Sequence, residues 1–333
     1  MKAILLEVQN LETTFKQRKS TIHAVNGVSF SLRKGEMLGV VGESGCGKSV
    51  SMLSILNLLP PAAVIKNGQI FFNGQDIRKM NKRDMQHIRG NKVGMIFQDP
   101  MTSLNPLMKI GVQISEALIY HKKLSKSQAL ERSAELLELV GISNARERLN
   151  EYPHQLSGGM RQRVMIAMAL SCNPDLLIAD EPTTALDVTI QAQIMKLIKN
   201  LSAKLDSSII LITHDLGLIA GMVDRVIVMY SGFIVEEALV DDLYYDPRHP
   251  YTISLLKSIP KLRGQEFTRL ASIEGSPPEL LEKPKFCPFA PRCRYSVERC
   301  SRENPALTIV PGKDNNPMHK VACWVNTKNG VLK

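Results

Sequence analysis

The most constraining feature of this chain is a glycine-rich string between an apolar run and an apolar helical pattern. The string is Gly42-Glu-Ser-Gly-Cys-Gly-Lys48-Ser49, and it directly follows the run Met37–Val41. It has the form G-x-x-x-x-G-K-[ST], in which the glycines let backbone amides turn inward around phosphates. Because the loop works between a strand and a helix, the sequence predicts an α/β fold that binds ATP or GTP.

Further apolar runs support this fold class. Leu176–Ala179, Ile209–Thr213 and Val226–Met229 have the composition of buried strands. They alternate with longer helical patterns, which is typical of a mostly parallel sheet.

The sequence pattern is different from about residue 100 to 172, and it predicts a helical insertion there. Ser125 and Gln128 can form a capping box at the start of a helix, and Gly141 can end it. Apolar residues between them follow helical spacing: Leu130, Ala134 and Leu137.

After about residue 235 the chain becomes rich in proline and has no long periodic segment. We therefore predict an ATPase-type domain over 1–235 and a small, loop-rich C-terminal extension over 236–333. Such an extension has little core and usually needs a cross-link, which four clustered cysteines could supply.

Composition excludes several classes of protein. The chain has 333 residues, with 44% hydrophobic and 22% charged residues, as in ordinary globular proteins. Its most apolar stretch, Met52–Ile65, is short and broken by prolines, and no signal-peptide pattern opens the chain, so we expect a cytosolic protein. The net charge of +10 suits nucleic acid and an anionic membrane face equally.

Two acidic residues, Asp180 and Glu181, follow the run Leu176–Ala179. At the carboxyl end of a parallel strand, Asp180 could hold the Mg²⁺ shell and Glu181 could orient the attacking water. The alternative is a solvated acidic turn, which many strands have.

A second candidate anion site is Ser157-Gly158-Gly159, at the start of the apolar helix pattern ending at Leu170. The alternative is an ordinary helix start with Ser157 as N-cap. Since this string has no lysine of its own, it makes sense as an anion site mainly if it completes a site on another chain.

In this order the motifs resemble those of the ATP-binding subunits of ABC transporters, over roughly residues 3–260. The matching motifs are Walker A at 42–49, the Q-loop Gln98, the signature at 156–160, Walker B at 176–181, the D-loop Ala185-Leu186-Asp187 and the switch His214. More narrowly, the chain resembles the ATPases of oligopeptide, dipeptide and nickel importers. That likeness rests on the runs Tyr152–Leu170, Glu181–Val188, His249–Thr252 and Cys287–Cys293.

The resemblance implies a nucleotide sandwich between two such subunits. ATP would lie on the phosphate loop, formed by Gly42, Glu43, Ser44, Gly45, Cys46, Gly47, Lys48 and Ser49, with Phe15 stacked on the adenine. Ser49, Gln98 and Asp180 would hold Mg²⁺. Glu181, His214 and Gln98 would be catalytic. Ser157, Gly158 and Gly159 would contact the γ-phosphate on the partner subunit.

The four C-terminal cysteines are Cys287, Cys293, Cys300 and Cys323, with spacing C-x5-C-x6-C-x22-C. This spacing lacks the C-x2-C knuckles of zinc ribbons, and thiolates from irregular loops also suit an iron–sulfur cluster. The resemblance to the peptide-importer group implies a [4Fe-4S] cluster, with Zn²⁺ or unligated thiols as alternatives. Nearby basic residues, Arg292 among them, could offset cluster charge or form a solvated face.

The resemblance therefore predicts an ATPase that powers import of di- and oligopeptides through two separate membrane permease subunits, with a peptide-binding protein acting indirectly. It would pair with a paralogous ATPase, or alternatively with itself, and lie peripherally on the cytoplasmic face of the membrane, with no nucleic-acid partner. The alternatives are a nickel importer ATPase, a soluble ABC ATPase acting on DNA or ribosomes, and a nucleotide-binding regulator. We also expect cysteine replacements in the tail to leave ATP binding intact.

Overall fold

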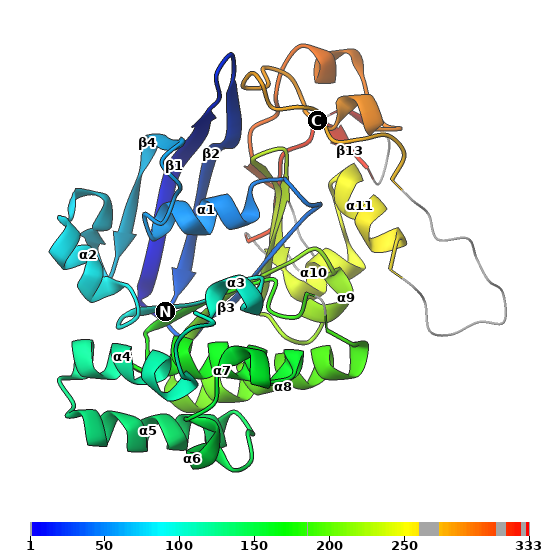
Figure 1. Cartoon of the computed structure of the whole chain (residues 1–333). Helices are drawn as coiled ribbons and strands as arrows, with labels where there is room; N and C mark the ends of the chain where they lie inside the picture. Colours follow the sequence, from blue (N-terminus) through cyan, green and yellow to red (C-terminus); the bar gives the residue numbers. More distant parts are fainter. Residues whose placement is uncertain (1, 185, 260–272, 311–317, 328–330, 333) are drawn as a thin grey trace, which may run out of the picture. The chain divides into compact units, whose positions relative to one another are not determined.

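The structure is a computed structural model that describes residues 2–184, 186–259, 273–310, 318–327 and 331–332 (Figure 1). Its contacts divide the chain into two compact units. Unit 1 comprises Met1–Ala3, Arg33–Glu36 and Lys79–Ile212, and unit 2 comprises Ile4–Leu32, Met37–Arg78 and Thr213–Lys333. This division does not test the predicted domain boundary at residue 235, which stays a prediction.

Unit 1 contains three parallel strands, β6 (Val93–Ile96), β7 (Leu176–Asp180) and β8 (Ser208–Thr213). Strand β7 lies between the other two, with Leu176 opposite Val93 on one side and Ser208 on the other. Every residue of β7 and β8 is buried, which explains why these strands read as continuous apolar runs. The strands predicted over 176–179 and 209–213 are confirmed.

Along the chain, the helices of unit 1 precede, separate or follow these strands. They are α2 (Lys82–Ile88), α3 (Pro100–Ser103), α4 (Ile110–Lys122), α5 (Lys126–Leu139), α6 (Ala145–Arg148), η2 (Pro153–Gln155), α7 (Gly158–Leu170) and α8 (Val188–Leu205). Helices α4, α5 and α7 pack against one another (Figure 1). The helix predicted after Ser125 is confirmed, and Ser125 and Gln128 form both hydrogen bonds of the capping box.

Unit 2 holds an antiparallel sheet of order β2-β1-β4-β5, which sequence reasoning did not predict. Its strands are β1 (Ile4–Lys16), β2 (Thr21–Arg33), β4 (Ala63–Phe72) and β5 (Gln75–Asp76), followed by η1 (Ile77–Lys79). Helix α1 (Lys48–Ile55) contacts β1. The fold is therefore α/β, as predicted, with this antiparallel sheet in addition to the parallel strands.

A second set of strands in unit 2 positions the phosphate loop. Strand β3 (Met37–Val41) is parallel to β9 (Arg225–Tyr230), which pairs with the antiparallel β10 (Phe233–Leu239). The strands predicted over 37–41 and 226–229 are confirmed. Short helix α9 (Leu216–Ile219) precedes β9.

The C-terminal extension adds short elements to unit 2. They are α10 (Val240–Tyr245), α11 (Pro250–Lys257), η3 (Ala290–Arg292), η4 (Glu298–Ser301), β11 (Thr308–Ile309), β12 (Lys320–Val321), β13 (Val325–Asn326) and β14 (Val331–Leu332). Strand β12 pairs with β10, and there the buried Glu236 accepts a hydrogen bond from His319 at 2.8 Å. The extension is thus attached to the sheet that carries the phosphate loop.

The helices that the structure describes include none that combines the length and apolar character needed to cross a membrane.

Candidate functional site

The phosphate loop connects β3 to α1 and depends on glycine at two places. Gly42 has φ +152°, and a Cβ atom there would lie 2.2 Å from the carbonyl oxygen of Met229. Gly47 has φ +98°, and its Cβ atom would lie 2.3 Å from the carbonyl oxygen of Ala24. Residues with a side chain rarely adopt either backbone conformation, so the loop closes tightly because these two residues are glycines.

Lys48 is the first residue of α1, and its side chain curls back over the loop. Its Nζ atom donates hydrogen bonds to the carbonyl oxygens of Gly42 at 2.7 Å and Glu43 at 3.0 Å. The half-buried Ser49 follows it in the first turn of α1. A buried ammonium group beside a helix N-terminus makes this loop a place for an anion.

Cys46 also lies in this loop, and it is buried. Burial raises the pKa of its thiol, although the charge of Lys48 opposes that shift. The side chain therefore acts as a small apolar residue of the loop rather than as a reactive thiolate.

Two other predicted site residues belong to unit 2. Phe15 lies near the end of β1, opposite Ala63 of β4, and is half-buried. His214 follows β8 and is exposed, and the next residue, Asp215, caps α9 by accepting a hydrogen bond from the Gly217 amide at 2.7 Å. Adenine stacking by Phe15 and the role of His214 stay predictions.

In unit 1 the structure brings two residues, Gln98 and Thr184, to the carboxylate of Glu181. Glu181 directly follows the buried Asp180 at the end of β7 and has φ +45°. Its carboxylate accepts hydrogen bonds from the Gln98 amide and the Thr184 hydroxyl, each at 3.0 Å. Gln98 and Glu181 are therefore in contact, while their shared role in an ATP site stays a prediction. Thr184 is a partner that sequence reasoning did not assign.

Ser157 is the N-cap of α7, where its hydroxyl accepts a hydrogen bond from the Met160 amide at 3.4 Å. Gly158 and Gly159 form the first residues of that helix. The ordinary helix start is therefore confirmed, while contact with a partner's nucleotide stays a prediction. In the D-loop, Ala185 lies outside the described residues.

The four C-terminal cysteines line one small cavity in the extension, together with Phe289 and Trp324. Burial is the main cause that raises the pKa of Cys287 to about 12 and that of Cys293 to about 11, and the neighbouring thiols add to it. Among the residues that the structure describes, no group of three or more His, Cys, Asp or Glu side chains is arranged to hold a metal ion. The shared cavity fits the predicted grouping of the cysteines, but a metal centre is not shown.

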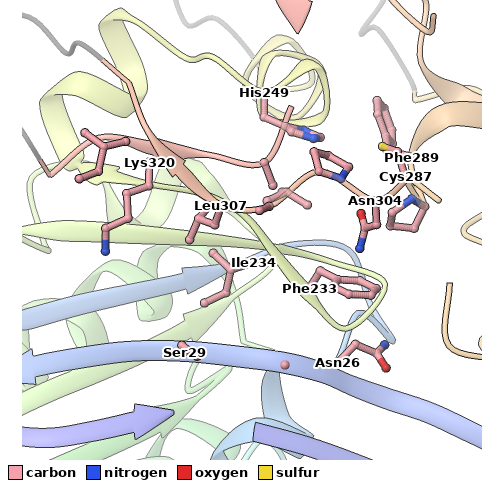
Figure 2. A pocket seen from close by; sticks show the side chains of 17 residues that line it. Asn26, Ser29, Phe233, Ile234, His249, Cys287, Phe289, Asn304, Leu307 and Lys320 are labelled. Carbon is pink, nitrogen blue, oxygen red and sulfur yellow. The ribbon is translucent and has the colours of Figure 1, made fainter. Parts of the chain in front are cut away.

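Two cavities are lined both by the extension and by other parts of unit 2. One, of about 630 Å³, lies between β2, β10 and the extension and is lined by residues such as Asn26, Phe233 and Leu307 (Figure 2). The other, of about 240 Å³, lies between the phosphate loop and Pro277, Pro278 and Leu280. The extension therefore reaches the loop itself.

Comparison with known proteins gives two family matches. The ABC transporter family matches residues 25–184, and the oligopeptide/dipeptide transporter C-terminal region matches residues 235–300.

Among similar proteins, the oligopeptide transport ATP-binding protein OppD of Bacillus subtilis is 52% identical over 96% of this chain and 88% of its own length. The dipeptide transport ATP-binding protein DppD of the same organism is 52% identical over 96% and 94%. OppD of Escherichia coli is 49% identical over 93% and 91%.

Among solved structures, a dimeric ATP-binding cassette, MJ0796, in a post-hydrolysis state with ADP and Pi is 28% identical. It has a TM-score of 0.64 and covers 71% of this chain and 99% of its own. The protein cbiO1 of Clostridium perfringens, part of the ABC transporter complex cbiONQ, is 26% identical, with a TM-score of 0.62, over 74% of this chain and 92% of its own.

Proposed function

Because this chain belongs to the ABC transporter ATPases that carry the oligopeptide/dipeptide transporter C-terminal region, we propose that it is the ATP-hydrolysing subunit of a di- and oligopeptide importer. The observation that carries this proposal is the closed phosphate loop with Lys48 folded over it, in a chain half identical to peptide-transport ATPases over nearly its full length.

In this proposal ATP binds on the phosphate loop of unit 2. The backbone amides between Gly42 and Ser49 and the Lys48 ammonium would hold the phosphates, and Ser49 would hold Mg²⁺. Phe15 would stack on the adenine. The buried position of Lys48 supports its role, because a lysine without water around it interacts more strongly with an anion.

Hydrolysis would use the residues at the end of β7. Asp180 and Gln98 would complete the Mg²⁺ shell. Glu181 would orient the attacking water, and His214 would be a further catalytic residue. The hydrogen bonds from Gln98 and Thr184 support this role of Glu181, since they fix the direction of its carboxylate.

A second ATPase subunit would complete the site through Ser157, Gly158 and Gly159. The exposed position of Ser157 and Gly158 at the start of α7 supports this proposal, because amides at a helix N-terminus can face another chain's phosphate. We propose a paralogous partner, with a homodimer as the alternative that co-purification tests.

Permease subunits would dock on unit 1. Several large apolar side chains are exposed after β6 and along α4: Phe97, Met101, Leu107, Val112, Ile119 and Tyr120, with Leu107 86% exposed and Met101 61%. These exposed side chains support the proposal, because large apolar patches on a protein surface are typical of protein interfaces. Two permeases bound there would place the chain peripherally on the cytoplasmic face of the membrane.

The extension would carry a [4Fe-4S] cluster on Cys287, Cys293, Cys300 and Cys323, with Zn²⁺ as the alternative. Their shared cavity supports this proposal, because a four-thiolate ligand set needs all four sulfurs around one space. When bound, the group would cross-link loops that otherwise have little core.

The test is transport by the complex assembled with its permeases and partner ATPase in vesicles. We expect ATP-dependent uptake of a labelled dipeptide or longer peptide that is lost in Lys48→Ala and kept in Lys34→Ala, which removes an exposed lysine. Uptake of Ni²⁺ in place of peptides would decide for the nickel alternative. Uptake that survives Lys48→Ala would refute the proposed ATP site.

A further inference from the structure

An arginine of the C-terminal extension forms an ion pair with the phosphate loop. The Arg292 guanidinium donates two hydrogen bonds to the Glu43 carboxylate, one at 2.7 Å and one at 3.1 Å. Its side chain is 5% exposed, and that of Glu43 is 26% exposed. A bidentate pair with one buried partner is among the stronger charge contacts in proteins.

Arg292 is itself held in place from three sides. Its remaining N–H groups donate to the carbonyl oxygens of Glu274 at 2.9 Å and Ile273 at 3.2 Å. Its guanidinium also donates to the Tyr230 hydroxyl at 3.2 Å. The hydrogen bond to Glu43 is the main cause that raises the pKa of Arg292 above its usual value. Arginine is charged in proteins even without such a shift.

The main chain of Glu43 has a second anchor in the same region. Its amide donates a hydrogen bond to the hydroxyl of Tyr251 at 2.7 Å, and Tyr251 is fully buried. The Tyr251 ring packs on Phe289 at 5.4 Å between ring centres. Phe289 lies in the turn that runs from Cys287 to Cys293, so this turn supplies the first anchor, Arg292, and packs against the second, Tyr251.

A carboxylate in a loop that receives phosphates has an electrostatic cost. Glu43 is the second residue of the phosphate loop, and its carbonyl oxygen accepts a hydrogen bond from Lys48. An unpaired negative charge there would repel an incoming triphosphate. The Arg292 guanidinium balances that charge.

We propose that Arg292 is a positioning residue for ATP binding, through which the C-terminal extension sets the ATP affinity of the phosphate loop. This inference rests on the proposed ATP site. It assigns the extension a role inside the ATPase unit, in addition to any role of its cysteines.

The experiment measures the Kd of a fluorescent ATP analogue with the full chain and its ATPase rate in the assembled transporter. We expect Arg292→Gln to raise the Kd and the KM for ATP about 10-fold, since loss of a partly buried partner leaves Glu43 unpaired. The rate at saturating ATP should change much less, because Arg292 does not touch the reacting groups.

The double variant Arg292→Gln/Glu43→Gln separates charge neutralisation from a merely structural role. It should recover most of the affinity that Arg292→Gln loses, because no unpaired carboxylate remains. Arg292→Lys should lie between wild type and Arg292→Gln, since lysine keeps the charge but not the fork. Arg302→Gln is the matched control, because Arg302 is exposed and pairs with Glu298, four residues before it.

An unchanged Kd in Arg292→Gln, or a double variant as weak as Arg292→Gln, would overturn the inference while the proposed ATP site stands. If the wild-type chain binds no ATP, or Lys48→Ala binds it equally well, the proposed ATP site fails and the inference fails with it.

Discussion

Replacing Gly47 by alanine tests whether the closure of the phosphate loop depends on the absence of a side chain. At φ +98° an L-residue costs roughly 1–2 kcal/mol relative to glycine. The new Cβ atom would also lie 2.3 Å from the backbone carbonyl of Ala24, which cannot move as a side chain can. Crowding of this kind adds about 1–3 kcal/mol. We therefore expect Gly47→Ala to lower stability by about 2–5 kcal/mol and to abolish ATP binding.

Gly45→Ala is the matched control, because Gly45 lies in the same loop at φ +79° with no atom within 4 Å of its Cβ position. It has the backbone cost alone, roughly 1–2 kcal/mol. A difference of about 2 kcal/mol lowers the melting temperature by about 4–8 °C in domains of 150–250 residues. Thermal unfolding followed by circular dichroism, with ATP binding measured in parallel, gives the comparison. Equal melting temperatures for the two variants would refute the steric argument.

Three further predictions concern turnover, assembly and the extension. Glu181→Gln should keep ATP binding but lose at least about 10²-fold in turnover in the assembled transporter, because the water loses its orienting carboxylate; near-wild-type turnover would contradict the assignment. The ATPase rate of the isolated chain should be low and rise more steeply than linearly with its concentration, or require the partner subunit, whereas a high rate independent of dilution would point to a self-contained site. Protein purified without oxygen should be brown and contain about four irons per chain. The iron should be lost when any of the four C-terminal cysteines is replaced by serine and kept in Cys172→Ser. One bound zinc per chain would decide for the Zn²⁺ alternative.

The local parts of the site could be predicted from the sequence because their physics is local. A glycine-rich string between a buried strand and an amphipathic helix has few other structures available, and Met37–Val41 and Lys48–Ile55 form that strand and helix. The capping box of Ser125 and Gln128 is likewise settled by residues three positions apart. In each case the deciding contacts fall within one or two turns of the chain.

The parts that could not be predicted depend on contacts between distant residues. Strand β1 pairs with β4 across a long stretch of sequence, with Leu6 opposite Phe72, and no pattern within either strand names its partner. The ion pair of Arg292 with Glu43 joins residues 249 positions apart. In sequence, Arg292 belongs to a run of basic residues that favours a solvated face or a counter-charge for a cluster. Only the fold shows that its guanidinium is buried against the phosphate loop.

The contacts of Arg292 also argue against the expectation that changes among the tail cysteines leave ATP binding intact. That expectation requires the extension to be a separate body, held together by its own cross-links. In the structure Cys293 directly follows Arg292, and the turn from Cys287 to Cys293 contains Phe289, which packs on Tyr251. Loosening that turn would therefore release the side-chain ion pair of Glu43 and disturb the packing of Tyr251, which binds the Glu43 amide. The proposed metal centre of the extension would act on nucleotide affinity by holding this turn in place, with no need to reach the nucleotide itself.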